Sequence, residues 1–264
     1  MMQKHPKLLF RILLPLACLG AGCGDILTKL EFDRMSGTAF PTAQEAPGST
    51  EGVQSLVQIF LETGLIFTVE EDQTNIAPLT GPADPFDPNQ YDYITPAEMD
   101  NLMSANRSIP TDPTTTTCGG GIFPEGECTT YYVYGIVTDH WYERSNGTRS
   151  TTTLGLMWDT SDRAGFAIFY KNSILNSDPV KYLRTTAHEI GHAFNLHHPD
   201  GASSTTVMNQ TGAINDAFTY EFSTGSQTHL SDHPVNCARP GTGPWASIHS
   251  SHTASHGNVT CTED

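Results

Sequence analysis

Basic side chains are scarce in this sequence. Its 264 residues include 13 Lys and Arg against 29 Asp and Glu, which gives a formal net charge of −16. A surface of that sign repels phosphate backbones and anionic lipid headgroups. The composition therefore argues against nucleic-acid binding and against a general attraction to membranes.

Long apolar runs are also missing, apart from one near the start. Residues 8–20 are apolar except for Arg11, follow a basic beginning, and form a run too short to span a bilayer comfortably. This pattern is typical of a signal peptide, so we predict that residues 1–22 are removed and that the protein is exported. The remaining chain has 10 basic and 29 acidic side chains.

The predicted cleavage site is followed by Cys23, which comes directly after the small residues 20–22. This segment resembles a bacterial lipobox, although Gly20 stands where that motif usually has Leu. The resemblance implies that Cys23 is lipidated and that the protein is a cell-envelope lipoprotein, with the lipid as its only membrane contact. The alternative is an ordinary signal peptide that leaves a secreted protein.

Cysteines are few, and none has the CxxC spacing of a metal knuckle. An even number of cysteines in an oxidising compartment predicts two disulfides. Three pairings are open, and local closure favours joining the first to the second and the third to the fourth. The four cysteines that follow Cys23 are Cys118, Cys128, Cys237 and Cys261.

The order of predicted elements indicates a mixed α/β sheet with a helix beneath it. Apolar spacing predicts a helix over 50–63, ended by Gly64, between strands at 26–32 and 65–69. Thr95, Pro96 and Glu98 form a capping box for a helix through about Asn106. Three β-rich runs follow within 129–172, and Asp178-Pro179 begins a helix that continues to about Asn195.

The region from about 72 to 128 is predicted to be a surface insertion. Residues 73–93 are rich in Pro, Asp and Asn, and 110–121 are interpreted as another loop. The acidic part could bind calcium, but nothing else in the sequence supports that, and a solvated loop is the simpler interpretation.

The segment from His188 to His198, HEIGHAFNLHH, contains the candidate metal ligands and the candidate catalytic residue. Residues i and i+4 share a helix face, so His188 and His192 can present ring nitrogens to one zinc ion. Glu189 lies where it can reach a metal-bound water. If the helix stops near Asn195, a residue that tolerates left-handed backbone, His198 can turn back as the third ligand.

Other ligands are weaker candidates. His197 adjoins His198, while Asp200 and Glu221 would suit other site architectures that the sequence does not otherwise support. The tail histidines lie in a polar terminus of the kind that is usually flexible. They are His249, His252 and His256.

The motif resembles the zinc-binding signature of the metzincin peptidases, HExxHxxGxxH, with Asn195 at the usual Gly. The resemblance implies His188, His192 and His198 as ligands of one Zn2+ and Glu189 as general base. It also implies a methionine turn beneath the zinc, and Met208, ten residues after His198, matches the short spacing of the matrixin branch.

The expected fold is therefore α+β and metzincin-like. It has a twisted, mixed, five-stranded sheet, two main helices with the zinc helix under the sheet, and a small irregular C-terminal part. Residues 23–264 would form one domain, with subdomains at 23–198 and 199–264. The run 151–159 would supply the edge strand that pairs with an extended substrate.

These features predict a monomeric zinc endopeptidase that acts on proteins or peptides outside the cytoplasm. One alternative is a zinc-binding lipoprotein that no longer cleaves and instead binds peptides or partner proteins. Glu189 argues against it, because a structural metal site has no need of that carboxylate. Another alternative is a hydrolase of small non-peptide substrates, which an open cleft with an extended edge strand would disfavour.

Overall fold

The computed structural model describes residues 27–79, 92–120, 123–144, 147–198, 205–209, 218–232 and 238–242. The predicted signal peptide and Cys23 lie outside these residues. Within them, no helix combines the length and the apolar character needed to cross a bilayer.

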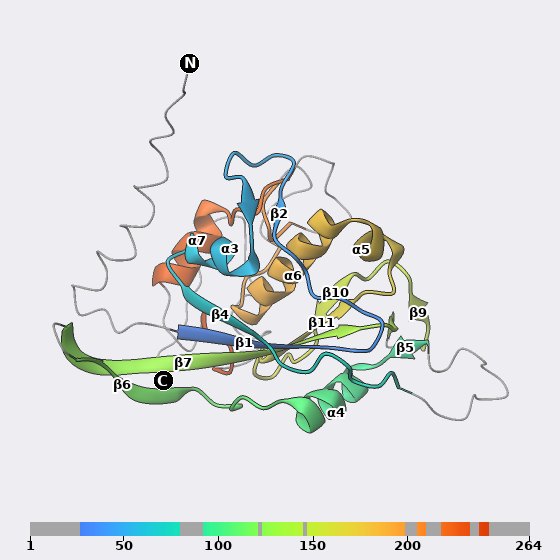
Figure 1. The fold of residues 1–264 in the computed structure, drawn as a ribbon, viewed down its shortest axis with the longest axis horizontal. Coiled ribbons are helices and arrows are strands. Elements are labelled where there is room, and N and C mark those ends of the chain that lie inside the picture. Colours follow the sequence, from blue (N-terminus) through green and yellow to red (C-terminus); the bar gives the residue numbers. More distant parts are fainter. Residues whose placement is uncertain are drawn as a thin grey trace, which may run out of the picture.

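A twisted mixed sheet forms the centre of the molecule (Figure 1). The strands run in the order β10-β11-β7-β1-β4, and β6 pairs with β7 as well. Strands β4, β1, β7 and β11 are mutually parallel, whereas β10 and β6 run antiparallel to their neighbours. The strands are β1 (Leu27–Arg34), β4 (Ile66–Glu71), β6 (Thr114–Gly120), β7 (Phe123–Thr138), β10 (Gly155–Met157) and β11 (Gly165–Phe169).

Short strands form two further small sheets. One pairs β2 (Gln44–Glu45) with β3 (Val53–Gln54). The other contains β5 (Tyr93–Ile94), β8 (Trp141–Glu143) and β9 (Arg149–Ser150).

Helices cover both faces of the central sheet (Figure 1). On one face α3 (Leu56–Leu61), α5 (Ser173–Ser177), α6 (Pro179–Ala193) and α7 (Thr224–Asp232) share an apolar core with the sheet. On the other face α4 (Pro96–Asn106) packs on a second core. Strand β7 contributes Val133 and Val137 to the first core and Tyr134 and Ile136 to the second, as the alternation of strand side chains requires. The predicted mixed α+β class is confirmed.

Two helices begin where local chemistry predicts. In α4 the Thr95 side chain accepts from the N–H of Glu98, and Glu98 bonds back to the N–H of Thr95. In α6 the Asp178 side chain accepts from the N–H groups of Val180 and Lys181. These caps satisfy backbone donors that a helix start leaves without partners, and they define where α4 and α6 begin.

The prediction of one helix over 50–63 is wrong in length. Gly52 has a φ of 76°, and Val53–Gln54 pair as β3 with Gln44–Glu45. Ser55 then caps a helix of only six residues, with Gln58 completing its capping box. A local cap overrides the apolar periodicity.

The prediction of a loop at 110–121 and of a five-stranded sheet is also wrong. Residues Thr114–Gly120 form β6, which pairs with the first half of β7 and makes the sheet six-stranded. Part of the predicted insertion therefore belongs to the central sheet. Threonine is β-branched, and a threonine run suits a strand once a partner is present.

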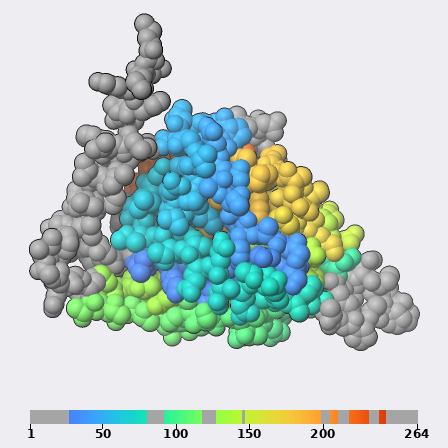
Figure 2. All heavy atoms as spheres, viewed as in Figure 1, coloured from blue at the N-terminus to red at the C-terminus, as the bar shows by residue number. Residues whose placement is uncertain are grey.

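Figure 2 shows which segments of the chain form one face of the molecule. Residues from the first third of the described chain, coloured blue to teal, cover most of the face seen in Figure 2. Residues of the α5–α6 region, in yellow, reach the surface beside them.

Candidate metal centre

Three histidine side chains meet beside the C-terminal half of α6. His188 and His192 lie on successive turns of that helix, and His198 follows the helix in the chain. The Nε2 atom of His198 lies 2.9 Å from Nε2 of His188 and 3.1 Å from Nε2 of His192. All three offer a ring nitrogen within 4.8 Å of one another. The structure thus brings together the three residues predicted as ligands.

The bonds of the other ring nitrogens define the tautomers of the two helical histidines. Nδ1 of His188 lies 2.8 Å from the carbonyl of Val207, and Nδ1 of His192 lies 2.7 Å from the carbonyl of Leu196. A carbonyl can only accept, so Nδ1 carries the proton in both rings and Nε2 carries a lone pair. The lone pairs of His188 and His192 therefore both point at the ring of His198, an arrangement that a metal ion between the three rings would satisfy.

Burial also favours neutral imidazoles. It lowers the pKa of His192 to about 3 and that of His188 well below the usual value, in both cases because the charged ring would be desolvated. The pKa of His198 is lowered by burial as well, with a further contribution from the Arg184 cation. Neutral rings are the form that binds metal ions.

The turn that returns His198 to the helix centres on Asn195. Its φ is 63°, in the left-handed region, as predicted. The Asn195 N–H donates to the carbonyl of His192 (2.8 Å), and the Leu196 N–H donates to the carbonyl of Gly191 (3.0 Å). These two bonds form a Schellman motif, which stops the helix and reverses the chain.

Glu189 is buried and held against strand β10. The backbone N–H of Met157 donates to its carboxylate, and a Cβ built on Gly155 would come within 2.5 Å of its Cγ. Only glycine at 155 leaves room for this side chain. Burial raises the pKa of Glu189 to about 8, while the Met157 N–H and the Arg184 cation oppose that shift.

Met208 packs against the same helix. It is fully buried, and a Cβ on Gly191 would overlap its sulfur. Its neighbour Val207 supplies the carbonyl bonded to His188. The structure thus places the predicted methionine next to the histidine-bearing helix, in the chain segment that also fixes one imidazole.

The outer edge of β10 faces this site. The Leu154 carbonyl accepts from the N–H of Phe169 in β11 (2.9 Å), so the twofold alternation of an antiparallel ladder turns the backbone groups of Gly155 and Met157 outward. On that side the Met157 N–H meets Glu189. In the described part of the chain, β10 ends the order of strands.

The remaining predicted residues divide into two groups. Cys128 is buried and disulfide-bonded. Glu221 is exposed and is not part of the histidine cluster in the described chain, while the ring of His197 is partly buried. The other predictions concern side chains outside those described, namely Cys23, Cys118, Cys237, Cys261, Asp200, His249, His252 and His256.

Arg184 is a contributor that the sequence did not reveal. It lies one turn before His188 on α6, is fully buried, and donates to carbonyls of the Thr206–Asn209 segment. The apolar residues at 182–183 and 187 indicate that this stretch of the helix is buried. An arginine in a buried stretch needs hydrogen-bond acceptors, and that was the available sequence signal for a role of Arg184.

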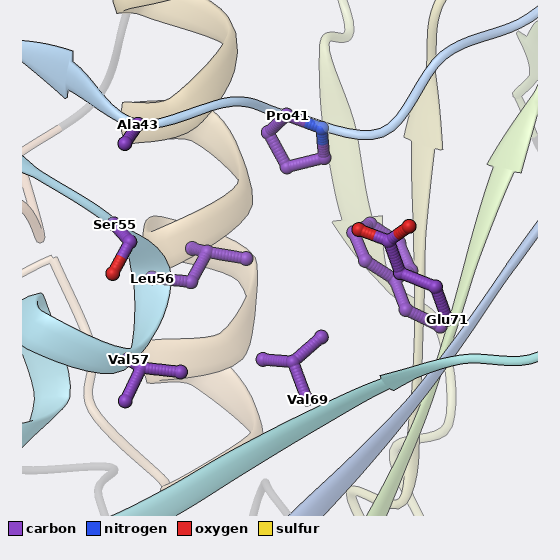
Figure 3. Close-up of a pocket in the computed structure, with 8 residues that line it drawn as sticks. Pro41, Ala43, Ser55, Leu56, Val57, Val69 and Glu71 are labelled. Atoms are coloured by element: carbon purple, nitrogen blue, oxygen red, sulfur yellow. The ribbon is translucent and has the colours of Figure 1, made fainter.

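Two further features of the described chain lie away from the histidines. Glu31, Asp33 and Asp72 gather on the α4 side of the sheet, where Glu31 accepts from the N–H groups of Ser108 and Ile109. A hollow of about 130 Å³ lies between α3, β4 and the segment at Pro41–Ala43 (Figure 3). Glu71 is the only ionisable side chain among its lining residues.

Comparisons with protein-family models, with curated proteins and with solved structures find no match. The geometry of the site is therefore the basis for the functional argument.

Proposed function

We propose that the chain is a zinc-dependent endopeptidase of the metzincin type, close to the matrixin branch. The observation that carries the proposal is the convergence of three neutral imidazole nitrogens beside a buried glutamate. Three nitrogen ligands with a fourth position left for water are typical of catalytic zinc sites. His188, His192 and His198 would hold the ion.

The donor set fits zinc. Imidazole is a borderline-soft ligand that suits zinc better than calcium or magnesium, which prefer oxygen. The Nδ1–H groups of His188 and His192 already bond to carbonyls, as the outer ring nitrogens of zinc-ligating histidines usually do.

Zinc bound there would supply Lewis-acid polarisation of a water and of the scissile carbonyl. The positive charge of the ion would favour the ionised form of Glu189, which burial alone disfavours. The carboxylate would then accept a proton from the attacking water and later donate it to the leaving amine. The Met157 N–H and the tight contact with Gly155 restrict the carboxylate to one orientation for both transfers. The resemblance assigns Met208 to the floor under the imidazoles, and its burial against α6 supports that role.

A peptide is the substrate that best suits the neighbourhood of Glu189. An extended peptide could add to the outer edge of β10, with main-chain hydrogen bonds giving affinity and side-chain pockets giving selectivity. Its scissile bond would then run past the carboxylate that already touches this edge. A small non-peptide substrate would not need such an edge.

Export remains part of the proposal. The disulfide at Cys128 supports an oxidising compartment, where such bonds persist. The substrates would then be extracytoplasmic proteins, reached by a secreted or lipid-anchored monomer.

The test combines metal content with cleavage. The purified mature chain should contain one zinc per molecule by mass spectrometry and should cleave casein in a chelator-sensitive way. Glu189→Gln should keep the zinc and lose cleavage by about 10²-fold or more, because only proton transfer is removed. His198→Ala should lose both.

Zinc in the wild type without cleavage of casein or of a peptide library would reject the peptidase and favour the non-catalytic binding protein. A wild type that binds no zinc would overturn the metal centre itself. Equal cleavage by Glu189→Gln would remove the role assigned to that carboxylate.

A further inference from the structure

A buried guanidinium holds the segment that orients the first histidine. One nitrogen of Arg184, Nη2, lies 2.8 Å from the carbonyl of Thr206, 2.9 Å from that of Val207 and 2.5 Å from that of Asn209. Its guanidinium also stacks over Phe218, 5.6 Å from the ring centroid. Arg184 thus joins α6 to a segment more than 20 residues later in the chain.

The position of Arg184 on the helix explains why this contact matters. Residues 184, 188 and 192 follow one another at i, i+4 and i+8, so their side chains lie along one face of α6. The Val207 carbonyl therefore receives two donors from the same face, Nη2 of Arg184 and Nδ1 of His188. The arginine fixes the acceptor that in turn fixes the imidazole.

The same segment carries Met208, whose sulfur lies against Gly191. A displacement of Thr206–Asn209 would remove the acceptor of His188 and the packing of Met208 together. Backbone bonds from the Val207 N–H to the Glu221 carbonyl (2.9 Å) and from the Thr219 N–H to the Thr205 carbonyl (2.9 Å) hold this segment to residues 219–221. Arg184 ties the segment to α6.

We infer that Arg184 is a positioning residue for the histidine site, which clamps Thr206–Asn209 to α6 and thereby holds His188 in the tautomer that leaves Nε2 free. The inference rests on the proposed metal centre for its consequence, although the clamp itself exists without a metal. Partners that orient ligating histidines commonly change metal affinity by 10- to 100-fold when they are lost.

Two substitutions separate the contributions of Arg184. Arg184→Lys keeps the positive charge but shortens the reach, and Arg184→Met keeps much of the volume without a donor. Arg163→Lys is the matched control, because Arg163 is equally buried and bonds to the carbonyls of Ala193 and Arg239 instead. All three variants should be less stable, so stability alone does not distinguish them.

Two readouts report on position rather than on stability. Nitrogen-15 NMR of the metal-free protein should show a protonated Nδ1 on His188 in the wild type and in Arg163→Lys. In both Arg184 variants that signal should shift or exchange rapidly. Zinc affinity by chelator competition should fall by about tenfold or more for Arg184→Lys and Arg184→Met, and stay within about twofold for Arg163→Lys.

An unchanged Nδ1 signal with unchanged zinc affinity in a folded Arg184 variant would overturn the inference. So would an equal loss in Arg163→Lys, which would make the effect one of general destabilisation. If the wild type binds no zinc, the proposed function fails, whereas the NMR comparison still decides whether Arg184 holds His188. If Arg184→Lys does not fold, Arg184→Met provides the same two measurements.

Discussion

At the scale of single residues, the site depends on short-range spacing that the sequence displays. His188, Glu189, His192 and His198 could be assigned because a helix of 3.6 residues per turn and one sharp turn are enough to relate them. Arg184 could not be assigned in this way. Its partners begin at Thr206, and no local rule says that this segment folds back under α6.

Asn195 provides the first prediction at this scale. Its φ of 63° costs alanine about 1–2 kcal/mol but costs glycine little. Asn195→Ala should therefore lower the free energy of unfolding by about that amount and weaken zinc binding, whereas Asn195→Gly should bind zinc like the wild type. Urea unfolding and chelator competition measure both. Equal losses for the two variants would mean that the side chain, not the backbone, determines the turn.

At the scale of elements, starts and stops were predictable wherever they rest on a few adjacent residues. The capping box at Thr95 and Glu98 and the Asp178-Pro179 start of α6 are of this kind. Strand β6 was not predictable, because its threonines acquire their structure from pairing with the first half of β7. Helix α3 is shorter than its apolar spacing predicts, because the Ser55 cap sets its start.

Strand β10 is the element whose fit with α6 can be tested. Gly155→Ala would drive a methyl group into the Cγ of Glu189, and it should destabilise the fold by about 1–3 kcal/mol and reduce cleavage. In a Glu189→Ala background the same change should cost less than about 1 kcal/mol, because the obstructing side chain is gone. Urea unfolding of the four proteins gives the coupling energy. Additive effects would mean that the two residues do not meet.

At the scale of the whole molecule, some of the many acidic side chains are buried in the interior. Asp33 is buried on the α4 side of the sheet, accepts from the N–H of Gln73 and from the hydroxyl of Tyr134, and lies near Glu31 and Asp72. Burial raises its pKa to about 6, against a usual value of 3.8. The folded state therefore holds this proton more tightly than the unfolded state.

That sign predicts a pH dependence. The contribution of Asp33 to stability is fully present below about pH 4 and is lost as pH rises through about 6. Asp33→Asn keeps an acceptor for Gln73 and cannot ionise, so its advantage over the wild type should grow between pH 4 and 7, to at most about 3 kcal/mol. Asp112→Asn, at an exposed carboxylate, controls for the loss of one charge. A difference that shrinks with rising pH would contradict the assignment.

The pairing of β1 with β7 has a consequence for the order of assembly. Leu27 aligns with Thr130, so the two central strands join residues 103 positions apart in the chain. Contacts of such sequence separation slow folding, since a long loop must close before they stabilise anything. The pairing of β1 has to wait until β7 has been synthesised, and α6, which packs on the sheet, comes later still in the chain. The central pairing of the sheet therefore cannot form until about half of the chain has been synthesised.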